Sequence, residues 1–221
     1  MKKRFWIALA GLLLLTACAS NRQAYDYTAF QTSNPASILV LPPINESPDV
    51  AASNSVLTNT VYPLAESGYY VFPVEVVKQA FRHNGLDVPN DIHAIPLDKL
   101  QEVFGTDAVL YITVTEYGTS YRVVQSGTDV AANARLVDAR TGATLWTGSA
   151  RASSNEGNNN SSGNIIGMLL TAVIQQIVES VADKGYDIAS VTSNRLLSAS
   201  VTDGILYGPR SPKYWKNQPK Q

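Results

Sequence analysis

The sequence is poor in the residues that build disulfides and metal sites. Its 221 residues include one cysteine and two histidines, which argues against a disulfide scaffold and against most zinc or iron sites. Charge is also scarce: only 16% of residues are charged, and 17 basic residues nearly balance 18 acidic ones. The chain therefore lacks the basic excess of a nucleic-acid-binding protein, while 45% hydrophobic residues make it too apolar to be disordered.

Motifs of common enzyme classes are missing as well. There is no Gly-x-Ser-x-Gly nucleophile elbow, no Gly-x-x-x-x-Gly-Lys-Ser/Thr phosphate loop and no Gly-x-Gly-x-x-Gly dinucleotide fingerprint. His83, near an expected helix end, and His93 are both interpreted as structural residues. Several aspartates are expected to cap helices, stabilise turns or face solvent: Asp87, Asp91, Asp98, Asp107, Asp129 and Asp138. We therefore expect no enzymatic activity, no cofactor and no bound metal.

The first 17 residues have the three parts of a secretory signal peptide. Basic residues at positions 2–4 precede an apolar run over residues 5–15, which is too short for a membrane-spanning helix. Leu15-Thr16-Ala17-Cys18 resembles the bacterial lipobox, in which the cysteine is acylated and becomes the first residue of the mature chain. The alternative is an ordinary signal peptide with an incidental cysteine. Ala19 is not the aspartate associated with inner-membrane retention, so resemblance to known lipoproteins implies the periplasmic face of the outer membrane.

Cleavage before Cys18 would leave 204 residues with 14 basic and 18 acidic side chains, a net charge of −4. We expect no basic cluster that could hold anionic lipid, so acyl chains should provide the anchor. Residues 18–36 are predicted to be a polar tether. Its Tyr25, Tyr27 and Phe30 are either incidental in a slack linker or docked on the domain or a partner.

Hydrophobic periodicity predicts one α/β domain over residues 37–208, with a mixed β-sheet flanked by helices. Strands are expected at residues 38–41, 69–72, 108–117, 128–137, 144–147 and 204–208. Helices are expected at residues 50–66, 74–84, 97–104, 165–184 and 187–199. Residues 153–164 form a polar loop, and residues 209–221 are predicted to be a flexible tail. The helix over 165–184 is interpreted as core-packing, with membrane insertion as the alternative.

Several segments together resemble a family of bacterial lipoproteins of unknown function. They are ILVLPP at 38–43, PLAESGYYV at 63–71, NGL at 84–86, FGTDAVLYI at 104–112 and the Asn-rich stretch after Glu156-Gly157. RLVDARTG at 135–142, followed by Leu145-Trp146, is similar to a hairpin in the curli-secretion lipoprotein and in lipoprotein activators of penicillin-binding proteins. The resemblance implies a domain like the N-terminal domain of the TolB translocation protein, which docks onto envelope partners and carries no catalytic residues.

The leading hypothesis is a non-catalytic adaptor or accessory subunit of an envelope transport or secretion assembly. Its partner would be a curli-secretion-like lipoprotein or a second copy of the chain. Candidate partner-binding residues are Asn158, Asn159, Asn160, Tyr214 and Trp215.

Two alternatives remain open at this point. The first is an activator of a peptidoglycan synthase, that is, of a penicillin-binding protein. The second is a small-ligand-binding envelope protein that uses Tyr111, Tyr117, Tyr121 and Trp146.

Overall fold

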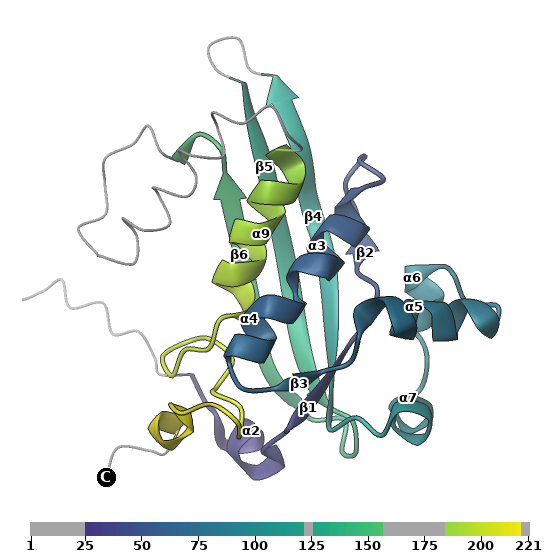
Figure 1. The fold of residues 1–221 in the computed structure, drawn as a ribbon, viewed down its shortest axis with the longest axis vertical. Coiled ribbons are helices and arrows are strands. Elements are labelled where there is room, and N and C mark those ends of the chain that lie inside the picture. Colours follow the sequence, from purple (N-terminus) through teal and green to yellow (C-terminus); the bar gives the residue numbers. More distant parts are fainter. Residues whose placement is uncertain (1–24, 122–125, 157–183, 218–221) are drawn as a thin grey trace, which may run out of the picture.

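A computed structural model describes residues 25–121, 126–156 and 184–217, and a mixed β-sheet lies at its centre (Figure 1). Its strands are β1 (Ser37–Val40), β2 (Ile44–Asn45), β3 (Tyr70–Val71), β4 (Ala108–Tyr121), β5 (Ser126–Asp138) and β6 (Thr144–Ser153). The strand order is β3-β1-β4-β5-β6, and β2 also pairs with β4. The pairs among β1 to β4 are parallel, whereas β4, β5 and β6 form an antiparallel meander. The predicted single α/β domain with a mixed sheet is confirmed.

The central strand β1 is buried on both faces because β3 and β4 flank it and helices cover both sides. Ile38 and Val40 face the larger hydrophobic core, whereas Leu39 and Leu41 face a smaller one. All four side chains are excluded from solvent, as the unbroken apolar run predicts. Pro42 and Pro43 follow directly and lack the N–H groups that would continue the ladder.

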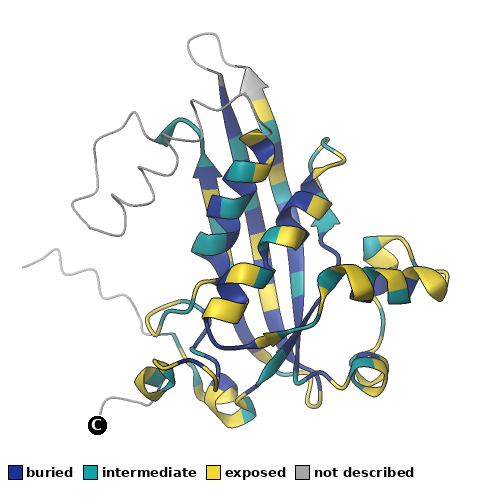
Figure 2. Cartoon of the chain, viewed as in Figure 1, coloured by how far each residue is buried: buried dark blue, intermediate teal, exposed yellow. Residues whose placement is uncertain are grey.

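The β4–β5 hairpin is the longest feature of the fold. Its ladder runs from the pair Ala108–Asp138 to the pair Tyr121–Ser126, with one irregularity between Val114 and Glu116. Buried and more exposed residues alternate along β5, as expected for a strand with one face in the core (Figure 2). The structure extends β4 four residues beyond the predicted end at residue 117.

Helices cover the two faces of the sheet unequally. They are α2 (Thr28–Ser33), α3 (Ala52–Asn59), α4 (Val61–Glu66), α5 (Val74–His83), α6 (Pro89–His93), α7 (Leu97–Phe104), α9 (Lys184–Leu197) and the short 3₁₀ helix η3 (Tyr214–Asn217). On one face, α3 and α9 lie side by side across β4, β5 and β6 (Figure 1). On the other, residues of α5, α6 and α7 pack against β1, the start of β4 and the adjoining residues Phe72 and Ala139. The described helices therefore leave part of the second face open.

Most helix boundaries follow the predictions, and the exceptions have local causes. Where the sequence predicts one helix over residues 50–66, the structure has α3 and α4, separated at Thr60. Pro63 explains the break, because a proline ring clashes with the carbonyl four residues earlier. The strand predicted at residues 204–208 is wrong: this stretch is irregular, although Ile205 and Leu206 are buried in the main core.

The predicted helix over residues 165–184 lies outside the described residues except for Lys184, which begins α9. Among the described helices, none combines the length and apolar composition needed to span a bilayer. The predicted likeness to the TolB N-terminal domain stays a prediction.

Two valines on helices provide a matched test of the core. Val56 on α3 is 2% exposed, and Val103 on α7 is 70% exposed. Val56→Ala should lower the free energy of unfolding by about 2 kcal/mol, because it removes two buried methyl groups and leaves a cavity. Val103→Ala should change it by less than about 0.5 kcal/mol. Urea denaturation followed by circular dichroism measures both, and equal effects would contradict this placement of the core.

Candidate functional site formed by the two terminal segments

The N-terminal segment, residues 25–36, packs onto the domain through three aromatic residues. Phe30 on α2 is buried in the main core, and Tyr25 and Tyr27 pack against that core. The ring centroids are 4.7 Å apart for Tyr25 and Tyr27 and 6.3 Å apart for Tyr27 and Phe30. The predicted tether over residues 18–36 is therefore wrong for residues 25–36, because their aromatic side chains gain more by burial than a linker would by staying solvated.

Hydrogen bonds fix the same aromatic residues to distant parts of the chain. The Tyr27 hydroxyl donates to the Gly204 carbonyl at 2.6 Å, and the Tyr25 hydroxyl accepts from the Thr147 amide at 3.1 Å. Burial, followed by the charge of Asp203 and the neighbouring Tyr25, raises the pKa of Tyr27 to about 12. Tyr27 therefore stays neutral and remains a hydrogen-bond donor at physiological pH.

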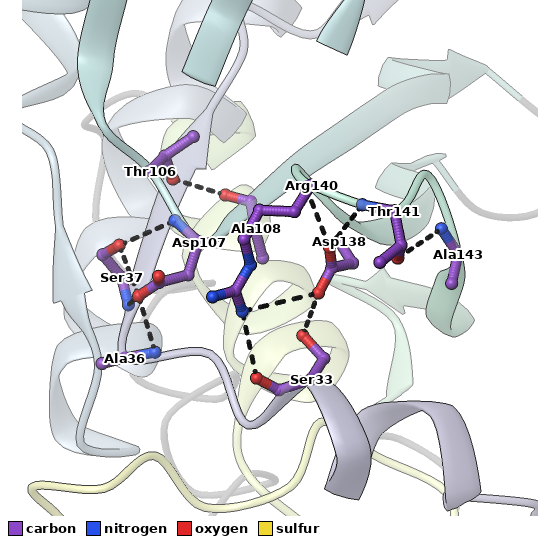
Figure 3. Close-up of polar contacts among 10 residues, drawn as sticks. All are labelled: Ser33, Ala36, Ser37, Thr106, Asp107, Ala108, Asp138, Arg140, Thr141 and Ala143. Carbon is purple, nitrogen blue, oxygen red and sulfur yellow. Dashed lines mark hydrogen bonds and ion pairs between the residues drawn. The ribbon is translucent and has the colours of Figure 1, made fainter. Parts of the chain in front are cut away.

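A buried carboxylate at the end of β5 holds α2 (Figure 3). The Asp138 side chain is only 2% exposed. One of its oxygens accepts from the amides of Arg140 and Thr141, both at 2.8 Å, and the other accepts from the Ser33 hydroxyl. The Arg140 guanidinium lies 3.8 Å from the second oxygen and donates to the Ser33 carbonyl at 3.3 Å. Burial alone would raise the pKa of Asp138, but the hydrogen bonds from Ser33, Thr141 and Arg140 outweigh it and lower that pKa.

A second carboxylate, Asp107, holds the residues between α2 and β1 (Figure 3). Its Oδ2 accepts from the amides of Ala36 and Ser37, both at 3.0 Å, and from the Ser37 hydroxyl at 2.9 Å. The Asp107 amide donates back to the Ser37 hydroxyl at 3.0 Å. The sequence predicts that each of the two aspartates caps a helix, stabilises a turn or faces solvent, and Asp138 stabilises a turn. The contacts to residues 33–37, some 70 and 105 positions away, leave no local signal in the sequence.

The C-terminal segment, residues 204–217, is also fixed to the domain. The Gly208 amide donates to the Ser67 carbonyl at 2.8 Å, and the Arg210 amide donates to the Gly68 carbonyl at 3.2 Å. Ser211 is buried against Gly68, whose φ of +97° and lack of a Cβ permit that contact. The predicted flexible tail over residues 209–221 is therefore wrong for residues 209–217, and residues 218–221 lie outside the described part.

The two segments meet and form one surface, which we call the terminal platform (residues 25–36 and 204–217). The Gln31 side-chain amide donates to the Asn217 carbonyl at 2.7 Å, and the Tyr214 hydroxyl donates to the Asn34 side-chain oxygen at 2.6 Å. Between them lies a hollow of about 250 Å³ whose lining includes these four residues. Figure 1 shows η3 and α2 at the same end of the molecule.

The predicted partner-binding residues have different outcomes. Tyr214 is half-buried and ties the terminal platform together, whereas Trp215 is 68% exposed, in line with the expected exposure. Cys18, Asn158, Asn159 and Asn160 lie outside the described residues.

The three described aromatic residues of the ligand-binding alternative, Tyr111, Tyr117 and Trp146, do not form one site. Trp146 is 2% exposed and donates from Nε1 to the Asp203 carbonyl at 2.9 Å, and Tyr117 is also buried in the core. Tyr111 lies in a separate shallow hollow of about 260 Å³, and the side chain of Tyr121 is outside the described part.

The histidines have structural surroundings. His93 Nε2 donates to the Pro42 carbonyl at 2.9 Å, and its ring meets Tyr111 edge to face at 5.2 Å. Burial lowers the pKa of His93, so the ring is neutral at pH 7. His83 is exposed at the end of α5. Within residues 25–121, 126–156 and 184–217, no three His, Cys, Asp or Glu side chains come together as a metal site.

The part of the sheet that no described helix covers is a polar surface, here called the open face. It consists of exposed side chains of β5 and β6 on the side away from α9: Asn133, Arg135, Thr147, Ser149 and Arg151. Asn133 lies opposite Ser149 and Arg135 opposite Thr147, so the residues form cross-strand rows. The edge of β6 is partly blocked, because Tyr25 caps the Thr147 amide and Arg195 donates to the Arg151 carbonyl at 2.7 Å.

Comparison with known proteins confirms the family resemblance. The model of the family described as "Putative lipoprotein GNA1162-like" matches residues 25–210. A putative lipoprotein of Neisseria meningitidis serogroup B, NMB1124/NMB1162, is 51% identical over 97% of this chain and 98% of its own length. The crystal structure of lipoprotein GNA1162 from Neisseria meningitidis is 55% identical, covers 66% of this chain and all of that chain, and has a TM-score of 0.53. A PelC dodecamer from Paraburkholderia phytofirmans is 11% identical, covers 73% of this chain and 86% of that chain, and has a TM-score of 0.43, which supports no functional conclusion.

The Asp138 carboxylate should make the stability of the domain depend on pH. Because its pKa is lowered on folding, its stabilising effect is present above the ordinary aspartate pKa of about 4 and is lost as pH falls further. Asp138→Asn should reduce the free energy of unfolding at pH 7 by about 1–3 kcal/mol. In this variant the free energy of unfolding should also fall less between about pH 5 and pH 3 than in the unmodified protein.

Urea denaturation at a series of pH values measures this dependence. Asp91→Asn, on the exposed side of α6, is the control and should change the value at pH 7 by less than about 0.5 kcal/mol. If Asp138→Asn does not fold, Ser33→Ala removes a single hydrogen bond to the same carboxylate. An unchanged pH profile in the folded variant would contradict the role assigned to Asp138.

Proposed function

Because the chain belongs to the GNA1162-like family of lipoproteins, we propose that it is a lipid-anchored adaptor of the bacterial envelope. In this proposal Cys18 carries the acyl chains, and the domain faces the periplasm from the outer membrane. The domain has no catalytic role and serves as an accessory subunit of a transport or secretion assembly, where it binds another envelope protein.

The observation that carries the proposal is the docked N-terminal segment. Tyr25 is fixed to the edge of β6, so only residues 19–24 separate Cys18 from the folded domain. A trans chain extends at most about 3.6 Å per residue, so these seven steps reach at most about 25 Å. A tether through residue 36 would reach more than twice as far. A short connection keeps the domain beside the membrane and raises the effective concentration of its surfaces for a partner there.

The open face is the surface we assign to the protein partner. Asn133, Thr147 and Ser149 are short and uncharged, and the Arg151 guanidinium is paired with Glu116 at 3.0 Å, so a second protein surface can approach without burying many unpaired charges. The hollows at this face are lined mostly by polar and charged side chains, whereas a small ligand requires a concave, largely apolar pocket, so the face suits a protein partner better.

The anchor has a direct test. Cys18→Ser should abolish acylation, because the thiolate sulfur is the atom that carries the lipid. The variant protein should lack the mass of the acyl chains in intact mass spectrometry and should leave the detergent phase in a detergent-partition assay. Ser20→Ala is the matched control and should remain acylated. Acylation of the Cys18→Ser variant would contradict the assignment.

The partner has a test by photo-crosslinking in cells. A photoreactive residue at Asn133 or Ser149 should capture an envelope protein. One at Val103, which is exposed on α7 and lies outside the open face, should not. A probe at Asn159 tests the predicted loop contact separately. Capture of a curli-secretion-like lipoprotein would support the transport adaptor, and capture of a penicillin-binding protein would favour the synthase activator.

Capture of a second copy alone would indicate a homo-oligomer. Equal capture from the open face and from Val103 would contradict the role of the open face.

A further inference from the structure

We propose that the C-terminal segment is a membrane-contact surface, which binds anionic phospholipid headgroups and orients the domain on the bilayer. The inference rests on the proposed anchor at Cys18 and goes beyond it, since an acyl anchor alone leaves the domain free to rotate about its connection. Four properties of the segment carry the inference: its charge, its unpaired cations, its exposed aromatic rings and its position.

The charge of the chain is concentrated at its C-terminal end. Residues 204–217 contain three basic side chains, Arg210, Lys213 and Lys216, and no acidic one. The rest of the chain from Cys18 onward has 11 basic and 18 acidic side chains, a net charge of −7. An anionic surface therefore attracts the C-terminal segment and repels the rest of the molecule. The two forces together turn the C-terminal segment toward that surface. The net charge of the whole chain, from which the expectation of no basic cluster is drawn, averages over this difference.

The described cations of the segment are free to meet such a surface. Among the residues that the structure describes, Arg210, Lys213 and Lys216 form no ion pair with a carboxylate. Basic residues elsewhere on the domain, such as Arg82 and Lys99, are paired with acidic neighbours. The Arg210 guanidinium donates to the Ala36 carbonyl at 3.3 Å, but none of the three cations has to leave a carboxylate when it binds a phosphate group.

Each of these cations lies over an aromatic ring. Arg210 lies 6.0 Å from the ring centre of Tyr70, and Lys213 lies 5.9 Å from that of Tyr207. Lys216 lies 5.6 Å from the ring of Trp215, which is the most exposed aromatic side chain described. Amphipathic rings next to lysine and arginine are the composition typical of a membrane–water interface, where the ring enters the headgroup region and the cation meets phosphates.

The position of the segment matches that of the anchor. Through the contacts of Gln31 with Asn217 and of Asn34 with Tyr214, η3 is held against the segment that leads back to Cys18. The linker limits Tyr25 to about 25 Å from the acylated residue, so this end of the domain must stay near the bilayer. Because η3 is fixed to α2, headgroup contact by η3 fixes the whole domain. The acyl chains already retain the protein, so the contact sets orientation and not retention.

The chain contains its own probe for this contact. Once residues 1–17 are removed, Trp146 and Trp215 are the remaining tryptophans. Trp146 is buried in the core, so a water-soluble quencher such as acrylamide reports almost entirely on Trp215. The experiment uses the acylated protein in neutral detergent, in phosphatidylcholine vesicles, and in phosphatidylethanolamine vesicles with about a quarter phosphatidylglycerol. Trp215→Phe gives the residual signal of Trp146.

We expect acrylamide quenching of Trp215 to fall at least about twofold in the anionic vesicles relative to detergent. The triple variant R210Q/K213Q/K216Q should lose this protection. The control K78Q/R82Q/K99Q removes three positive charges from the exposed sides of α5 and α7 and should keep it. Both variants should still float with the vesicles, because the acyl chains are unchanged.

Three outcomes would overturn the proposal. Equal quenching of Trp215 in detergent and in anionic vesicles would show that the segment does not meet the bilayer, and capture of a protein by a crosslinker near Trp215 would then assign it to that partner. If both triple variants lost the protection of Trp215 from acrylamide equally, the protection would depend on the net charge of the protein and not on the C-terminal segment. A mature protein that lacks acyl mass would refute the anchor together with the orientation, whereas an acylated protein with unprotected Trp215 refutes the orientation alone.

Discussion

Two aspartate carboxylates at the end of the β4–β5 hairpin determine how the chain enters the domain. Asp138 accepts hydrogen bonds from its own turn and from Ser33, and Asp107 accepts them from Ala36 and Ser37. A carboxylate inside a protein is stable only when such donors replace water, so the N-terminal segment and the β5–β6 turn support each other at Asp138. Loss of the N-terminal segment would leave Asp138 with the Arg140 and Thr141 amides and would remove the Ala36 and Ser37 donors to Asp107. The position of α2, and through it that of η3, depends on this constraint.

The sheet divides the domain into parts with different tasks. α3 and α9 cover one face completely, which supplies most of the buried apolar surface. The second face is shared: α5, α6 and α7 close the half near β1, and the other half is exposed. The terminal platform lies at a third position, at the end of the strands. Stability, the proposed protein contact and the proposed lipid contact therefore involve different residues, so variants can test each one separately.

Local sequence patterns predict the elements whose causes are local. The run at residues 38–41, the helix at 97–104 and the hairpin around residues 138–142 follow from apolar periodicity and turn-forming residues, and the structure has all three. The two terminal segments are mispredicted for the opposite reason. Tyr27 and Tyr214 obtain their partners at Gly204 and Asn34, more than 170 positions away. Composition alone marks such segments as polar linkers. The proposed lipid-contact residues are missed because net charge averages a basic end with an acidic remainder.

The β4–β5 hairpin also has a mechanical consequence. Twelve steps at about 3.4 Å each place its far end at Ser126 at most roughly 41 Å from Asp138. Both of its strands run lengthwise between that far end and the carboxylates that hold the N-terminal segment. A force on the far end of the described strands is therefore transmitted along them to Asp138 and across to Ser33 on α2. The hairpin is a stiff arm that is fixed at the carboxylates holding α2.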